Sequence, residues 1–223
     1  MKLVVLAAGL GTRMREQTGG APKHLLDVAG TTILGRVVDL ANFLGLEPLV
    51  VTRPEFEEAF RSQGVDVVVE GPTPDMMITL SQARRHVRGT FAWIGGDMLF
   101  ADPVPLKELL EGHFASGSFC SFLYCRTDRF KAKLHFRPEP EVLVTRQGEH
   151  VFSIPNFLVQ SDESFAYMNG HVAGDPRGNF LQRAMDQGKP VFFQEYHGRV
   201  FEIDTPADLE EARRYFGQCV SIS

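Results

Sequence analysis

Apolar runs and helical repeats alternate along the first half of the chain. Near-continuous apolar runs, bounded by glycine, proline or charged residues, predict buried strands at Lys2–Ala7, Pro48–Thr52, Val65–Val69 and Phe91–Ile94. Apolar residues at helical spacing predict helices at Thr32–Leu44, Glu55–Gln63, Met77–Val87 and Pro105–Phe114. The turn at Gly30–Thr32 can cap the first of them. Strands and helices in this order are joined by right-handed crossovers. We therefore expect an α/β fold, with a Rossmann-like, mostly parallel sheet that carries helices on both faces.

From residue 118 to about residue 159 the extended pieces become shorter. Their spacing and the prolines between them predict a small extended, antiparallel lobe, with runs at Lys133–Phe136, Val142–Thr145 and Val151–Ile154. The last part of the chain predicts a helix, two strands and a final helix, at Phe180–Gln187, Val191–Gln194, Val200–Ile203 and Ala207–Tyr215. We find no internal repeat and no low-complexity linker. The expectation is a single domain over residues 1–223, made of two halves, 1–117 and 118–223.

Composition and charge exclude several classes of protein. With 223 residues, of which 43% are hydrophobic, the chain is long enough to bury a sizeable core. Its 28 acidic residues outnumber 23 basic ones, and this net charge of -5 is opposite to the footprint of a nucleic-acid binder. No apolar run approaches the roughly 20 residues of a membrane span. Three cysteines form no disulfide framework, so we expect a cytoplasmic protein. From the net charge and the short apolar runs we expect neither nucleic acid nor a membrane as a partner.

A glycine-rich loop directly follows the first predicted strand, at the position where open α/β sheets bind ligands. The segment Leu6–Met14 is LAAGLGTRM, in which Gly9 and Gly11 would let backbone N–H groups approach the oxygens of an anion. It is neither a Rossmann fingerprint, which needs a small residue where Met14 stands, nor a P-loop, which needs GKS or GKT. A tight turn without a ligand is the alternative for such a loop on its own.

A second motif follows the loop and makes the pattern specific. Pro22–Gly30 is PKHLLDVAG, placed after the glycine pair 19–20. Together the two motifs resemble the signature of the nucleotidyltransferases that activate sugar phosphates and related phosphorylated alcohols. The resemblance implies that the phosphate of a small molecule attacks the α-phosphate of a nucleoside triphosphate and releases pyrophosphate. It also implies that residues 1–117 bind the nucleotide and that residues 118–223 bind the acceptor.

The same resemblance assigns individual residues to the nucleotide. Arg13 would hold the outer phosphates, and Lys23 would lie beside the reacting phosphates, which makes these two the catalytic candidates. Positioning and charge neutralisation of this kind are what a displacement at phosphorus requires. The nucleotide-binding candidates in the two motifs are Leu6, Ala7, Ala8, Gly9, Gly11, Thr12, Arg13 and Lys23. Solvent-facing charges in a flexible loop are the alternative for Arg13 and Lys23.

Two carboxylates match the metal-binding positions of these enzymes. Asp97 follows the fourth predicted strand, in GGDM, and is also a nucleotide-binding candidate; Asp204 lies in FEIDTPADLEEA near the end of the chain. Carboxylate oxygens suit Mg²⁺, which binds one or two protein carboxylates together with substrate phosphates. We therefore expect Mg²⁺ as the cofactor. The alternative is that Asp204 or Thr205 merely caps the last helix. Glu202 and Asp208 are weaker metal candidates and are expected to be solvated.

The base and the acceptor are the least defined parts of the site. The segment Glu70–Leu80 lies where the family reads the base, so Asp75 and Thr79 are candidates for base contacts. It resembles the shorter cytidylyltransferases more than the hexose-phosphate enzymes, which favours CTP. Lys131, Lys133 and the segment 169–171 are candidates for the acceptor, a sugar, polyol or amino-alcohol phosphate.

Two other functions stay open beside this one. The guanylyltransferases of molybdopterin cofactor synthesis share the loop and the Gly-Asp-Met element, so a relative of those enzymes is one alternative. A nucleotide-binding protein that keeps the fold without turnover is the other. The presence of Lys23, Asp97 and Asp204 favours an enzyme over the second alternative. The oligomeric state also stays open.

Overall fold

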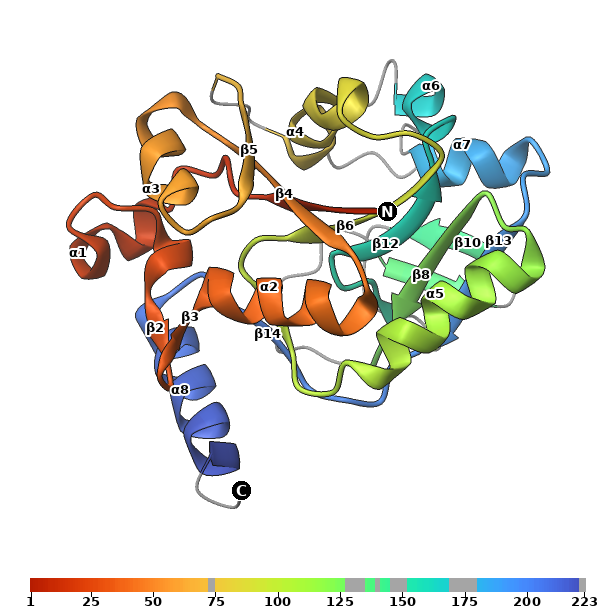
Figure 1. Ribbon diagram of the computed structural model, residues 1–223. Helices are drawn as coiled ribbons and strands as arrows, with labels where there is room; N and C mark the ends of the chain where they lie inside the picture. Colours follow the sequence, from red (N-terminus) through yellow and green to blue (C-terminus); the bar gives the residue numbers. More distant parts are fainter. Residues whose placement is uncertain (72–74, 127–134, 139–140, 145–151, 169–179, 221–223) are drawn as a thin grey trace.

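A seven-stranded sheet forms the centre of the molecule (Figure 1), in the order β13-β8-β12-β6-β1-β4-β5. The computed structural model describes residues 1–71, 75–126, 135–138, 141–144, 152–168 and 180–220. The strands are β1 Lys2–Leu6, β4 Glu47–Thr52, β5 Asp66–Val69, β6 Thr90–Gly95, β8 Cys120–Tyr124, β12 Phe157–Ser161 and β13 Val191–Glu195. Every neighbouring pair is parallel except the two pairs made by β12. The mostly parallel sheet predicted from the sequence is confirmed.

Helices cover both faces of this sheet, as predicted (Figure 1). Because side chains alternate along a strand, Leu3 and Val5 of β1 belong to one buried cluster and Val4 and Leu6 to the other. The first cluster also contains side chains of α2 Ile33–Leu44, α5 Val104–Ser116 and α8 Pro206–Val220. The second contains side chains of α4 Met76–Gln82, α6 Ser164–Met168 and α7 Phe180–Asp186. None of the helices among the described residues is long and apolar enough to cross a membrane.

Caps and 3₁₀ turns set the ends of the predicted helices. The hydroxyl of Thr32 accepts a hydrogen bond from the amide of Gly35 at 2.9 Å, which caps α2 as the preceding turn predicted. The predicted helix at 55–63 divides into a 3₁₀ turn, η3 Pro54–Phe56, and α3 Glu57–Arg61. The predicted helix at 77–87 likewise ends in a 3₁₀ turn, η4 Ala83–Arg85. The last helix, α8, extends beyond its predicted end.

The second half of the chain differs in part from expectation. Three short strands form the antiparallel sheet that was predicted: β9 His135–Pro138, β10 Glu141–Val144 and β11 Phe152–Ser153. Strand β12, expected in the same small lobe, instead lies in the central sheet between β6 and β8. Two further pairs were not predicted, β2 Asp27–Val28 with β3 Thr31–Thr32, and β7 Met98–Phe100 with β14 Val200–Glu202. The central sheet therefore contains strands from both sides of residue 117.

Candidate active site

The glycine-rich loop and Asp97 meet at one edge of the sheet. Leu6, the last residue of β1, pairs with Gly95, the last residue of β6, so both strands end at the same edge. The amide of Gly96 donates to the carbonyl oxygen of Leu6 at 2.9 Å. A Cβ atom at Gly96 would lie 2.9 Å from that same oxygen and 2.9 Å from the His24 ring. Only glycine permits this close approach, which sets Asp97 beside the loop.

The pairing of β7 with β14 brings Asp204 to the same place. In this antiparallel pair Glu202 lies opposite Met98, which is the residue that follows Asp97. The amide of Ile203 donates to the carbonyl oxygen of Asp97 at 2.9 Å. Two carboxylates from distant parts of the chain are therefore fixed side by side by backbone hydrogen bonds.

The cap of α8 leaves the Asp204 side chain free for the site. Thr205 and Asp208 cap the helix reciprocally: the Asp208 carboxylate accepts from the Thr205 amide at 2.7 Å, and the Thr205 hydroxyl accepts from the Asp208 amide at 3.3 Å. The same carboxylate accepts from the amide of Asp204 at 3.1 Å. Asp208, expected to be solvated, thus positions this segment. The cap that was considered for Asp204 is provided by its neighbours.

Lys23 lies at the centre of these groups. It belongs to a 3₁₀ turn, η2 Lys23–Leu25, and its side chain is only 9% exposed. Its Nζ atom donates to Asp97 Oδ2 at 2.6 Å, to Asp204 Oδ1 at 3.0 Å and to the carbonyl oxygen of Ile203 at 2.8 Å. Arg13, from η1 Thr12–Met14, donates through Nη2 to Asp204 Oδ2 at 2.7 Å. Arg13, Lys23, Asp97 and Asp204 are called the charged cluster below.

The surrounding charges hold Lys23 and Asp204 of the charged cluster in their ionised forms. Burial alone would lower the pKa of Lys23, but Asp97 and Asp204 outweigh it and raise that pKa above its ordinary value. Burial would raise the pKa of Asp204, but Lys23 and Arg13 outweigh it and lower that pKa. The stability that these shifts contribute is fully present between the ordinary pKa values, 3.8 for aspartate and 10.5 for lysine, and is lost outside that window.

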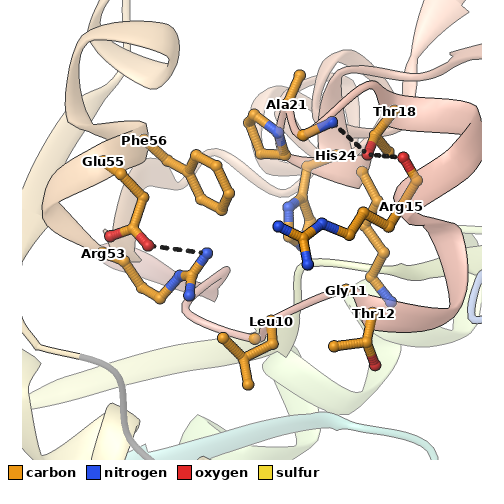
Figure 2. A pocket seen from close by; sticks show the side chains of 14 residues that line it. Leu10, Gly11, Thr12, Arg15, Thr18, Ala21, His24, Arg53, Glu55 and Phe56 are labelled. Atoms are coloured by element: carbon orange, nitrogen blue, oxygen red, sulfur yellow. Dashed lines mark hydrogen bonds and ion pairs between the residues drawn. The ribbon is translucent and has the colours of Figure 1, made fainter.

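A cavity of about 260 Å³, called the loop pocket below, opens beside the charged cluster (Figure 2). Its lining residues are Gly9, Leu10, Gly11, Thr12, Arg15, Thr18, Gly20, Ala21, Pro22, Lys23, His24, Arg53, Glu55 and Phe56. Gly11 has a φ of 58°, a left-handed conformation that glycine adopts without strain. Leu6, Ala7 and Ala8 are buried where β1 ends, whereas Thr12 is exposed on the loop.

Comparison with known proteins decides the family. The MobA-like NTP transferase domain matches residues 3–199. This chain belongs to that family. The match covers both motifs and Asp97, so the resemblance to nucleotidyltransferases stated from the sequence is confirmed.

Relatives of the MobA-like domain are longer proteins. The bifunctional IPC transferase and DIPP synthase of Thermococcus kodakarensis is 33% identical over 226 residues, which cover 96% of this chain and 50% of that protein. The bifunctional protein GlmU of Bifidobacterium animalis subsp. lactis is 36% identical over 132 residues, which cover 54% of this chain and 28% of that protein. This chain therefore spans half or less of the length of these relatives.

Solved structures share the whole fold of the MobA-like domain. A Bacillus anthracis structure, described as a glucose-1-phosphate thymidylyltransferase, matches with a TM-score of 0.83 at 16% identity, over 97% of this chain and 95% of that one. The UTP-bound UGPase of Acinetobacter baumannii matches with a TM-score of 0.79, also at 16% identity, over 97% of this chain and 93% of that one. At this identity the likeness shows the fold alone.

In this chain Asp75 and Thr79 lie at the start of α4. The Asp75 carboxylate accepts from the amides of Met77 at 2.7 Å and Ile78 at 3.3 Å, and so caps the helix. The Thr79 hydroxyl donates to the carbonyl oxygen of Asp75 at 3.1 Å. Contacts of these two residues with a base stay a prediction. Lys131, Lys133 and the segment 169–171 lie outside the described residues.

Several residues of the loop pocket were not singled out from the sequence, and His24 and Arg53 are the two that matter most below. His24 lies inside the second motif, and Arg53 follows β4 directly. Because β4 is parallel to β1, its end lies at the same sheet edge as the glycine-rich loop. This position was the signal that could have drawn attention to Arg53.

Proposed function

We propose that this chain joins the nucleoside monophosphate of a nucleoside triphosphate to the phosphate of a small molecule and releases pyrophosphate. The observation that carries the proposal is the charged cluster, which lies beside a glycine-rich loop at one edge of the sheet. Its four side chains come from distant segments and converge where the family's motifs would place a nucleotide. Membership of the MobA-like NTP transferase domain family supports the same reaction.

In this reaction an oxygen of the acceptor phosphate bonds to the α-phosphorus. The bond between the α-phosphorus and the oxygen that bridges the α- and β-phosphates breaks, and pyrophosphate leaves. Lys23 is buried and held by two carboxylates, so it would present a fixed positive charge beside the reacting phosphates. Arg13 is half-exposed and would hold the outer phosphates. Charges positioned in advance lower the barrier, because negative charge develops on the departing pyrophosphate.

We propose Mg²⁺ as the cofactor, with Asp97 and Asp204 as its protein ligands. Both carboxylates contact the same nitrogen atom, so their oxygens lie within reach of a single cation. No cluster of three or more His, Cys, Asp or Glu side chains suited to a metal occurs among the described residues. Two carboxylates fit Mg²⁺, which takes its other oxygens from water and from substrate phosphates. The bound ion would supply positive charge at the α-phosphate.

The proposed substrates are CTP and a sugar, polyol or amino-alcohol phosphate. CTP rests on the likeness of Glu70–Leu80 to the shorter cytidylyltransferases. The names of the structural neighbours, glucose-1-phosphate thymidylyltransferase and UGPase bound to UTP, support the general class of an NTP with a sugar phosphate. A MobA-like guanylyltransferase and a nucleotide-binding protein without turnover are the competing functions.

The test is a panel of CTP, GTP, UTP and TTP crossed with phosphorylated sugars, polyols, amino alcohols and a molybdopterin acceptor, with pyrophosphate as the readout. We expect Mg²⁺-dependent release with at least one pair and none in EDTA. Release that occurs best with GTP and a molybdopterin acceptor would favour the guanylyltransferase. Nucleotide binding without release for any pair would favour the non-catalytic protein.

We expect Arg13→Ala to raise the KM for the nucleotide about tenfold and to change kcat less than about threefold, because one charge-assisted contact with the outer phosphates is lost. Steady-state kinetics with varied nucleotide measure both constants. Arg61→Ala is the matched control, because the Arg61 side chain is also 52% exposed and pairs with a single carboxylate, Glu57, at 2.8 Å. Equal effects of the two substitutions would assign Arg13 to the solvated surface.

Asp75→Asn separates a contact with the base from a helix cap. Asparagine caps helices about as well as aspartate, so we expect the melting temperature to stay unchanged. If Asp75 also reads the base, the ratio of kcat/KM between CTP and UTP should change roughly tenfold. Thermal unfolding and competition between the two nucleotides measure these effects. An unchanged ratio would leave Asp75 with the cap alone.

A further inference from the structure

Arg53 is a buried cation with an unsatisfied hydrogen-bond donor. Only 7% of the residue is exposed, and its guanidinium lies 4.7 Å from the centre of the Phe56 ring. Nη2 pairs with Glu55 at 3.0 Å, whereas the buried Nε has no hydrogen-bond partner among the described residues. In Figure 2 the guanidinium points into the loop pocket. Arg53 therefore brings a positive charge to the wall of the loop pocket, and one of its donors is left without a partner.

A second residue that lines the same pocket, His24, also has an unsatisfied buried atom. His24 is 4% exposed, and its Nδ1 atom likewise lacks a partner within the described part of the chain. The ring is held between Gly96 and the Phe60 ring, whose centroid lies 5.7 Å away. Burial, and then the charge of Lys23, lower the pKa of His24 to about 4, so the imidazole is neutral. A neutral imidazole donates from one ring nitrogen.

Two lining residues of one pocket with unsatisfied buried atoms indicate a polar ligand. A buried polar group without a partner destabilises the fold, more so if it is charged, and a polar ligand next to it offsets that cost. Among the described lining residues, Arg15, Lys23 and Arg53 are basic and only Glu55 is acidic. The glycine-rich loop forms part of the same wall, with its backbone close to the cavity. The pocket therefore favours an anion that accepts several hydrogen bonds.

We propose that Arg53 is a further phosphate-binding residue, which holds the terminal phosphates of the nucleotide and the pyrophosphate that they become. This inference rests on the proposed function, because the nucleotide supplies the polyphosphate. Its α-phosphate would lie toward Lys23 and the charged cluster, and its outer phosphates would extend into the loop pocket toward Arg53. The described residues of Glu70–Leu80, proposed to read the base, do not line this pocket. The Glu55 carboxylate opposes the anion and so weakens its binding.

The test is isothermal titration calorimetry of the full chain with sodium pyrophosphate in EDTA, which needs neither turnover nor metal. We expect Arg53→Gln to raise the Kd for pyrophosphate about tenfold. Glu55→Gln should lower the Kd for pyrophosphate, because this substitution removes a negative charge and frees Nη2 of Arg53. Neither change should alter the Kd for CMP, which has no outer phosphates. Arg61→Gln is the control, since Arg61 is an exposed arginine paired with Glu57.

A folded Arg53→Gln variant that binds pyrophosphate as the unmodified chain does would overturn the inference. If this variant unfolds, Glu55→Gln decides, because it keeps Arg53, and an unchanged Kd would then reject a phosphate at this position. An unmodified chain that binds no pyrophosphate would also reject it. Each of these results leaves nucleotidyl transfer to be judged by its own assay. If the chain binds pyrophosphate through Arg53 but forms no pyrophosphate from any nucleotide of the substrate panel, the proposed function is refuted instead.

Discussion

Replacement of Asp97 by asparagine is expected to lower kcat about 10³-fold, and Asp204→Asn is expected to act alike. Each change removes one carboxylate charge from the proposed metal site and keeps the volume of the side chain. In either variant Lys23 retains the other carboxylate and the carbonyl oxygen of Ile203. The fold should therefore persist, with a loss of about 1–2 kcal/mol in the free energy of unfolding. Initial rates across a Mg²⁺ series and urea unfolding measure the two effects.

The control for these variants is Asp66→Asn. Asp66 is an exposed carboxylate that pairs with a lysine, Lys2, at 3.3 Å, so the exchange removes the same charge far from the site. Activity within about twofold of the unmodified chain is expected there. If Asp97→Asn and Asp204→Asn both kept normal activity and the same Mg²⁺ requirement, the metal site would be wrong.

Lys23→Met is expected to lower kcat by about 10²–10³-fold, because it removes a preorganised positive charge next to the reacting phosphates. The same change should strengthen metal binding. Asp97 and Asp204 lose the cation that lies between them, so the affinity for Mn²⁺ in the absence of nucleotide should rise. Single-turnover kinetics measure the first effect, and calorimetric titration with MnCl₂ measures the second.

Lys2→Met serves as the control for Lys23. Lys2 also lies between two carboxylates, Glu47 at 2.9 Å and Asp66 at 3.3 Å, but at the opposite end of β1. Its loss should change neither kcat nor the affinity for Mn²⁺. A kcat of Lys23→Met within about threefold of the unmodified value would mean that Lys23 only supports the fold, as a buried counter-ion of the two carboxylates.

Local patterns account for the elements that were predicted correctly. Near-continuous apolar runs identified β1, β4 and β6, and the apolar stripe of α2 together with Thr32 identified that helix and its beginning. Each of these signals acts over a few residues, through side-chain direction or a single capping hydrogen bond. Boundaries were less accurate where 3₁₀ turns adjoin a helix, as in the segment 54–61, because both conformations share similar backbone angles.

Partners that are distant in the chain were harder to predict. Strand β12 is a short apolar run that local pattern cannot distinguish from the hairpin strands of the small lobe. Its place between β6 and β8 depends on two sets of backbone hydrogen bonds with strands far away in the chain. The role of Asp208 was missed for a related reason. A carboxylate in a polar motif looks solvated until the cap that it forms with Thr205 is seen.

The sequence by itself determined the fold class and the two motifs, because side-chain periodicity and motif spacing are local properties. The resemblance carried by those motifs named Arg13, Lys23, Asp97 and Asp204 as candidates, and their roles stay predictions. The tertiary structure alone decided that Lys23 bridges two carboxylates and that Arg53 and His24 face the same pocket. Those contacts depend on the parallel end of β4 beside β1 and on the pairing of β7 with β14. Strand pairing over such separations is set by packing and backbone hydrogen bonds of the whole fold, which no short stretch of sequence encodes.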